Sequence, residues 1–309
     1  MNQATDLQQR LESGKGVLLA EISPPADPAP QGVQQLAKRF AGKVHALGIC
    51  DNRDRVGMAA LAAASLVAGQ GVEPILHVTT RDRNRIALVS ELLGAHALGI
   101  RNILCTSGTH QTLGHFRAAK NVYDVDVIQL LQTCANLARD ASLVGEGAMA
   151  GADGFCLGAV ASPNADLIEL QMVRLDKKVS AGAGFLVSQP IYDLERFRAW
   201  WVEVCRRGLH EKTAILAGIE PLGEAELERV RAKRRPSPRV PDAVFQQVAS
   251  QTDPAARRRA AIDVAVQTIR QLSGTKGLRG FSISVDGDPD AALEIIELAH
   301  LGFGGLGTN

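Results

Sequence analysis

The sequence has few aromatic residues and no long apolar run. Phe, Trp and Tyr together make up 4% of its 309 residues. No stretch reaches the roughly 18 apolar residues that a membrane-spanning helix needs. The first residues, MNQATDLQQRLESGKG, are polar and lack the apolar centre of a secretory signal peptide. We therefore predict a cytoplasmic protein with no membrane association.

Several common functional motifs are also missing. No GxGxxG follows the first expected strand, and GxxxxGK followed by Ser or Thr does not occur, so the standard dinucleotide and phosphate-binding loops are excluded. The five cysteines include no CxxC pair, which favours reduced, mostly buried thiols over a zinc site or a disulfide framework. The net charge of +1 argues against a dedicated nucleic-acid binder.

The sequence does contain enough apolar residues for a full-sized core, arranged in a repeating pattern. Hydrophobic residues make up 46% and charged residues 22% of the chain. Around residues 74–109, the apolar runs Glu73–Val78 and Asn102–Cys105 flank a polar turn and a segment with apolar residues at helical spacing. A strand, a helix and a strand in this order predict a parallel pair with a right-handed crossover.

The same alternation runs through the whole chain. Eight apolar runs separated by helical segments predict a single α/β domain over residues 1–309, a (β/α)8 TIM-type barrel with an N-terminal helix (Thr5–Ser13) and extra C-terminal helices. Segment 231–241, RAKRRPSPRVP, is basic and contains prolines; we expect an exposed loop there, either simply solvated or a phosphate or partner site. The expected strands are Val17–Ile22, Val44–Cys50, Glu73–Val78, Asn102–Cys105, Gly154–Ala159, Phe185–Gln189, Thr213–Ala217 and Gly280–Val285.

In such a barrel the carboxyl ends of the strands form one mouth, where chemistry takes place. Glu21 stands near the end of the first strand and shortly before two prolines. A carboxyl group facing an apolar interior there can have a raised pKa and act as a general acid. Alternatively, Glu21 forms a salt bridge with Arg81 or Lys178, and the sequence alone does not separate these two roles.

Other polar residues stand near strand ends or face the barrel. His77 is favoured as a hydrogen-bonding or packing residue over a metal ligand, because no carboxylate or second histidine stands at ligand spacing beside it. Gln189 offers the donor and acceptor that a heterocyclic amide requires. Lys177 and Lys178 are adjacent, mid-helix; one of them must lie closer to the barrel, where it either holds an anionic group or faces solvent.

A set of motifs occurs in consistent order from about Val17 to Leu222. They are AEISPP, LHVTTRDRNR, ALGIRNIL, SGTHQ, KNVYDVD, KKVSAGAGFLVSQPIYD and AGIEPL. Together they resemble the methylenetetrahydrofolate reductase family. The resemblance implies a (β/α)8 barrel that binds FAD non-covalently and reduces 5,10-methylenetetrahydrofolate to 5-methyltetrahydrofolate in one-carbon metabolism.

The resemblance also implies roles for individual residues. Glu21 matches the family's general acid, which supplies a proton when the methylene bridge of the folate opens. Gln189 matches a glutamine that contacts the substrate. The flavin contacts that the resemblance implies are Cys50, His77, Gly108, Thr109, Tyr123 and Lys178.

Three positions depart from the family pattern. Thr109 stands where the family usually has an aspartate near the flavin, and loss of that negative charge is expected to raise the flavin reduction potential. Ser162 stands where the family often has a tyrosine, directly before the proline of the loop after the fifth strand. The last strand reads GFSISVD in place of a pattern associated with nicotinamide and folate binding, which leaves NAD(P)H as electron donor open.

These departures leave more than one function open. The first is reduction of the folate substrate, and the second is the same chemistry reversed, oxidation of 5-methyltetrahydrofolate during demethylation. The third is a folate- or flavin-binding subunit of a larger redox complex, which exchanges electrons with a partner protein. An oligomer is compatible with the sequence but not required, because a barrel of this size buries its own core.

Overall fold

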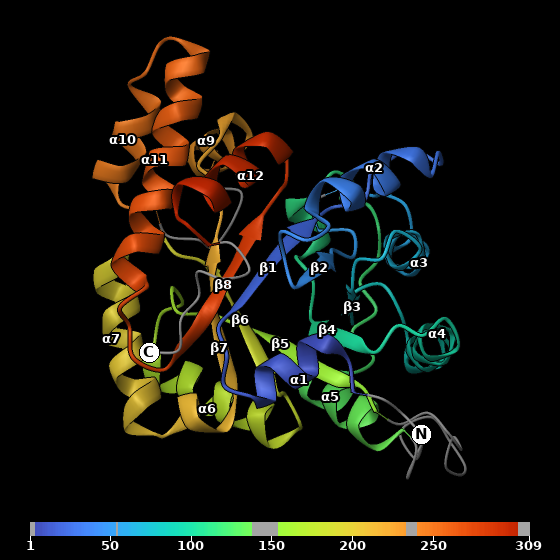
Figure 1. The fold of residues 1–309 in the computed structure, drawn as a ribbon. Helices are drawn as coiled ribbons and strands as arrows, with labels where there is room; N and C mark the ends of the chain where they lie inside the picture. Colours follow the sequence, from blue (N-terminus) through green and yellow to red (C-terminus); the bar gives the residue numbers. More distant parts are fainter. Residues whose placement is uncertain (1–3, 54, 138–153, 233–239, 302–309) are drawn as a thin grey trace.

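The computed structural model describes residues 4–53, 55–137, 154–232 and 240–301. These residues form a closed barrel of eight parallel strands in which each strand lies beside its neighbours in chain order. Helices surround the barrel (Figure 1). The predicted (β/α)8 fold class is therefore confirmed. The strands are β1 Val17–Ile22, β2 Ala46–Ile49, β3 Pro74–Thr79, β4 Asn102–Thr106, β5 Cys156–Ala161, β6 Phe185–Pro190, β7 Ala214–Ile219 and β8 Leu278–Ser284.

The last strand starts earlier than the sequence predicted. β8 begins at Leu278, before the predicted start at Gly280. Leu278 pairs with Ile215 of β7, whereas Gly280 pairs with Val17 of β1. The edge of β8 that faces β7 therefore begins two residues before the edge that faces β1.

Apolar side chains fill the barrel interior, and the N-terminal helix α1 (Asp6–Glu12) closes one end of it. Leu7 and Leu11 of α1 belong to the same buried cluster as inward-facing strand residues such as Phe185. Glu73, which directly precedes β3, accepts a hydrogen bond from the backbone N–H of Leu7 at 3.0 Å. The predicted N-terminal helix is thus confirmed, and it covers the amino ends of the strands.

A second apolar layer lies between the strands and the surrounding helices. The predicted helix 125–141 begins at Val127, after a capping box formed by Asp126 and Gln129, and residues 138–141 lie outside the described chain. No helix of the described ranges is long and apolar enough to cross a membrane. The helices of this layer are α2 Gln31–Phe40, α3 Ala60–Ala68, α4 Arg85–Ala97, α5 Val127–Asn136, α6 Ile168–Ser180, α7 Leu194–Arg206, α8 Leu209–Lys212 and α12 Pro289–Leu298, and the short 3-10 helix η1 covers Gln111–Leu113.

Further helices stand between β7 and β8, as predicted. α10 and α11 extend beyond the barrel at the upper left of Figure 1. They share a separate apolar cluster with residues such as Leu222. Of the predicted basic loop 231–241, Arg231 instead ends a helix, and residues 233–239 lie outside the described chain. These helices are α9 Glu224–Arg231, α10 Asp242–Ala249 and α11 Pro254–Leu272.

An irregularity between β6 and β7 fixes the position of Gln189. The register of the two strands shifts between Val187 and Pro190. Ser188 Oγ accepts a hydrogen bond from the Gly218 N–H at 2.9 Å, and a Cβ on Gly218 would lie 2.2 Å from the Ser188 carbonyl oxygen. Only glycine allows this close approach. The resulting bulge leaves Gln189 beside the mouth of the barrel.

Candidate active site

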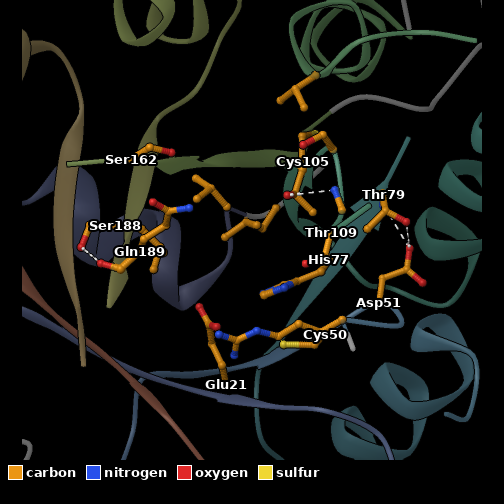
Figure 2. Close-up of a pocket in the computed structure, with 18 of the residues that line it drawn as sticks. Glu21, Cys50, Asp51, His77, Thr79, Cys105, Thr109, Ser162, Ser188 and Gln189 are labelled. Atoms are coloured by element: carbon orange, nitrogen blue, oxygen red, sulfur yellow. Dashed lines mark hydrogen bonds between the residues drawn. The ribbon is translucent and has the colours of Figure 1, made fainter. Parts of the chain in front are cut away.

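A cavity of about 400 Å³ lies at the carboxyl ends of the strands. Figure 2 shows Glu21, His77 and Gln189 arranged around the same space. These residues come from β1, β3 and β6, which are far apart in the sequence. Of the site residues that the sequence predicted, all except Tyr123 line this cavity, namely Glu21, Cys50, His77, Gly108, Thr109, Lys178 and Gln189.

Glu21 projects into the cavity from β1 and has a hydrogen-bonding partner on β8. The hydroxyl of Ser282 donates to Glu21 Oε1 at 3.1 Å. Neither salt bridge considered for Glu21 is present within the described ranges, because Arg81 pairs with Asp82 at 2.6 Å and Lys178 donates to a backbone carbonyl. The carboxylate is therefore held by a neutral hydroxyl and remains available to a ligand.

His77 lies next to Glu21 and is buried. Its Nε2 atom has no hydrogen-bond partner among the described residues. Gly48 of β2 provides the necessary space, since a Cβ there would lie 2.9 Å from His77 Nε2 and 3.1 Å from Glu21 Cγ. Burial lowers the pKa of His77, so its imidazole is neutral near pH 7. The described residues contain no cluster of side chains suited to holding a metal ion.

The loop after β4 contributes backbone to the cavity. Gly108 has φ +76°, and a Cβ on it would lie 3.2 Å from Arg81 Cβ, so a larger residue would be both strained and crowded. The carbonyl oxygen of Thr109 accepts a hydrogen bond from Arg81 Nη1 at 2.6 Å. Tyr123, further along the chain, does not line the cavity and is 41% exposed.

Lys178 reaches the cavity from outside the barrel. It lies in the last turn of α6, not mid-helix as the sequence suggested, and Nζ donates to the Val160 carbonyl oxygen at 2.6 Å. Lys177 is exposed, so Lys178 is the lysine of the pair that turns inward. Burial, with a smaller effect of the Arg174 charge, lowers the pKa of Lys178 to about 8.

The lowered pKa predicts a pH dependence of stability. Between pH about 8 and the ordinary lysine pKa of 10.5, the unfolded chain binds a proton at Lys178 that the folded protein does not bind. The Lys178 contribution to the free energy of unfolding therefore rises with pH in this window. In urea titrations at about pH 7.5 and about pH 10, the wild type should gain stability relative to Lys178→Met as the pH rises. Lys177→Met is the control, and an equal difference at both pH values for Lys178→Met would contradict the prediction.

All five cysteines are free, and four of them are buried, as the sequence predicted. Cys50 follows β2 and lines the cavity. Burial, reinforced by the charge of Glu21, raises the pKa of the Cys50 thiol well above its ordinary value. Cys50 is therefore a neutral thiol at physiological pH and presents a weak donor to a ligand.

A buried carboxylate in the cavity wall joins the ends of β2 and β3. Asp51 is completely buried and accepts hydrogen bonds from the backbone N–H of Thr79 at 3.0 Å and from its hydroxyl at 2.8 Å. Arg83 donates to the same carboxylate through Nη1 at 2.5 Å and through Nη2 at 3.2 Å. This network fixes the end of β3 just beyond His77.

A second charged network crosses the mouth between β2 and the last two strands. Arg53 pairs with Glu220 at 3.2 Å and with Asp286 at 3.5 Å. Asp286 in turn accepts hydrogen bonds from the backbone N–H of Ser23 at 2.9 Å and from its hydroxyl at 2.8 Å. Burial opposes the charge on Arg53, but the charge of Glu220 and other acidic groups nearby raises its pKa well above the ordinary value.

Sequence reasoning did not assign functional roles to Asp51, Arg53 or Asp286. Asp51 and Arg53 belong to the segment DNRDR, whose repeated charges are also typical of a solvated loop. One signal pointed to Asp51, because it directly follows the predicted strand Val44–Cys50. No local sequence signal pointed to Arg53 or Asp286, because the ion pair between them depends on closure of the barrel.

In (β/α)8-barrel enzymes, the active site lies at the carboxyl ends of the strands and contains polar and titratable side chains. The cavity of this chain has the same location and the same kind of lining. Sequence comparison narrows the class to a family. The family model described as "Methylenetetrahydrofolate reductase" matches residues 6–298, and the chain belongs to that family. The resemblance predicted from the motifs is thus confirmed.

Curated relatives match over part of their length. Methylenetetrahydrofolate reductase 1 of Schizosaccharomyces pombe is 29% identical over 162 residues, which cover 49% of this chain and 23% of that protein. The probable methylenetetrahydrofolate reductase (NADPH) of Caenorhabditis elegans is 28% identical over 191 residues, 58% of this chain and 25% of that protein. The matched region thus spans about a quarter of each relative.

Solved structures share the fold at low sequence identity. An uncharacterized protein from Clostridium thermocellum, described as binding two copies of 5-methyl-5,6,7,8-tetrahydrofolic acid, has a TM-score of 0.64 and 13% identity, covering 95% of this chain and 97% of that chain. The Bacillus cereus spore cortex-lytic enzyme SleL has a TM-score of 0.51 and 11% identity, covering 92% and 74%. Both are similar to this chain in barrel architecture.

Proposed function

We propose that this protein is a flavin-dependent methylenetetrahydrofolate reductase that converts 5,10-methylenetetrahydrofolate to 5-methyltetrahydrofolate. The observation that carries the proposal is the meeting of Glu21, His77 and Gln189 around one cavity in a chain of this family. The motif resemblance assigns each of these residues a family position, and each comes from a different strand.

The cavity has features that fit FAD. Buried His77 Nε2, which has no partner among the described residues, offers an unused hydrogen-bonding position. Lys178 is a cation below about pH 8 and suits an anionic ligand. His77, Lys178, Cys50 and the backbone at Gly108 and Thr109 would hold the cofactor. When bound, the flavin supplies a group that accepts and gives a hydride.

Glu21 would act as the proton donor to the folate. The five-membered ring of the substrate has to open before its methylene carbon accepts a hydride. Opening breaks a carbon–nitrogen bond, and the nitrogen that leaves takes up a proton. Glu21 is the acid in the cavity that is not engaged in an ion pair within the described ranges, and the Ser282 hydroxyl holds its carboxyl group in place.

Gln189 and His77 would orient the substrate and the cofactor. The Gln189 carboxamide carries one acceptor and two donors, which match the amide edge of a pterin. The bulge at Gly218 fixes the backbone beneath Gln189, so that its side chain is presented from a rigid strand end. The neutral imidazole of His77 adds a hydrogen bond without placing another charge beside Glu21.

A second candidate function is the reverse reaction, oxidation of 5-methyltetrahydrofolate. Thr109 favours it, because a neutral residue at this cavity position stabilises a negatively charged reduced flavin more than an aspartate would. A folate- or flavin-binding subunit that exchanges electrons with a partner protein uses the same residues.

Anaerobic mixing tests these functions directly. Protein reconstituted with FAD is mixed separately with NADH, NADPH and 5-methyltetrahydrofolate, and the flavin absorbance at about 450 nm is followed. If the protein is a reductase, 5-methyltetrahydrofolate should reduce the flavin slowly, and 5,10-methylenetetrahydrofolate should reoxidise the reduced protein.

The outcomes separate the candidates. Rapid bleaching by 5-methyltetrahydrofolate alone supports the oxidative function, and bleaching by a nicotinamide identifies the electron donor. A protein that stays colourless after incubation with FAD, or a flavin that responds to neither folate, would overturn the proposal.

A further inference from the structure

The proposed function uses only one of the two adjacent lysines, Lys177 and Lys178. Lys178 turns inward from α6 and lines the main cavity, whereas Lys177 is exposed. Helix α6 lies on the outer surface of the barrel (Figure 1). Its outward side is therefore available for an interaction that is separate from the chemistry in the cavity.

The outward side of α6 is apolar at its centre. Leu170 and Val173 are each 44% exposed, and Leu167, directly before the helix, is 73% exposed, although all three are large apolar residues. Residues three apart lie on the same face of a helix. Helix α6 packs on the barrel through Met172 and Leu175 and leaves the other three side chains to solvent. We call Leu167, Leu170 and Val173 the α6 face, and a group of exposed apolar side chains of this kind is typical of an interaction surface.

Charged residues of opposite sign flank the α6 face at its two ends. Glu169 is exposed at the amino-terminal end, and Arg174 and Lys177 are exposed at the carboxyl-terminal end. Asp166 adds a second acid before the helix, and its side chain is 81% exposed even though it pairs with an arginine of α7. Asp176, beside Lys177, is the exception to this division. One end of the face is thus acidic and the other is mainly basic.

This pattern is complementary to a reversed copy of itself. Leu170 and Val173 stand at equal distances from the midpoint of the segment between Glu169 and Arg174. If two α6 helices pack antiparallel about a two-fold axis at this midpoint, Leu170 of each copy meets Val173 of the other. The acidic end of each helix then lies against the basic end of the other, which brings Glu169 near Lys177 of the other copy. The antiparallel arrangement also sets the helix dipoles favourably.

We propose that the α6 face binds the α6 face of a second copy of this chain, and that the protein forms a two-fold symmetric homodimer through this contact. The contact is a single pair of helices and is smaller than the interface of a permanent dimer. The dimer is therefore weak, with a dissociation constant on the order of 100 μM. Because the same face is used up in both copies, the assembly stops at two chains. Lys177 belongs to the interface and Lys178 to the cavity, so each lysine of the pair has its own role.

Sedimentation velocity on the full-length protein at low ionic strength tests this interface, over concentrations from about 10 to about 500 μM. The wild type shifts from monomer to dimer as the concentration rises. Leu170→Glu abolishes the shift, because it places two like charges at the centre of the contact. Lys177→Glu weakens the dimer about thirtyfold, because two symmetry-related attractions to Glu169 become repulsions. The double variant Glu169→Lys/Lys177→Glu restores most of the affinity, because the two charges have exchanged ends.

Lys38→Glu is the matched control. Lys38 is an exposed lysine in the last turn of another barrel helix, α2, and its reversal leaves the dimer unchanged. A wild type that stays monomeric over the whole concentration range overturns the inference. So does a dimer that survives both Leu170→Glu and Lys177→Glu, because another surface then forms the contact. If the double variant remains as weak as Lys177→Glu alone, the antiparallel arrangement is wrong.

Discussion

Replacing Glu21 by glutamine is expected to lower the turnover of methylenetetrahydrofolate by roughly a thousandfold, within the range observed for loss of a positioned general acid. The carboxamide has nearly the same shape as the carboxyl group and still accepts a hydrogen bond from Ser282. It has no proton to give at the ring-opening step. Flavin binding should be unchanged, because the cofactor contacts proposed here come from other residues.

Steady-state kinetics and flavin absorbance of the purified variant measure both effects. Glu12→Gln removes an exposed carboxylate from α1, at the far end of the barrel, and should behave like the wild type. Reduction of bound flavin by a separate donor, followed without folate, shows whether the remaining chemistry is intact. Full folate turnover by Glu21→Gln would show that another group supplies the proton.

Asp51→Ala is expected to cause the largest loss of stability among the substitutions considered, about 3–5 kcal/mol of the free energy of unfolding. Asp51 is completely buried, and its removal leaves the Arg83 guanidinium and both Thr79 donors without their acceptor. Among the described residues, Arg83 keeps only the longer contact with Glu91, at 3.5 Å. The end of β3 should loosen together with the wall of the cavity.

Urea unfolding of the wild type and the variant measures the loss. Asp290→Ala is the control, because it breaks an ion pair with Arg39 that lies on the surface, where such pairs contribute little. Asp51→Asn should be intermediate, since the amide oxygen still accepts a hydrogen bond from Thr79. Similar midpoints for Asp51→Ala and Asp290→Ala would show that the buried network does not hold the strand ends together.

The architecture was predictable because its signals are local. Strand runs and helical spacing repeat along the chain, so the barrel and its N-terminal helix were identified without tertiary information. Glu21, His77 and Gln189 were identified as candidates because each stands near the end of an apolar strand. The carboxyl ends of parallel strands share one edge, which brings such residues together.

The remaining features depend on contacts that no local pattern records. Arg53 meets Asp286 across 233 positions of sequence, and only ring closure makes them neighbours. The inward turn of Lys178 follows from how α6 packs, and its neighbour Lys177 has the same side chain but faces solvent. Tyr123 was assigned by the resemblance alone, and its place outside the main cavity follows from the path of a long loop.

The seam between β1 and β8 joins the beginning of the chain to its end. Glu21 pairs with Ser284 along this seam, Ser282 donates to Glu21, and Asp286 binds Ser23. During synthesis on a ribosome, β2 follows β1 closely, whereas the partner on the other edge of β1 is complete only after Ser284 has been added. The proposed acid therefore has neighbours made early, such as Gly48 of β2, and a hydrogen-bond donor on β8 that is made much later. A ligand that binds only the closed barrel, where Ser282 holds Glu21, therefore stabilises the closure between β1 and β8.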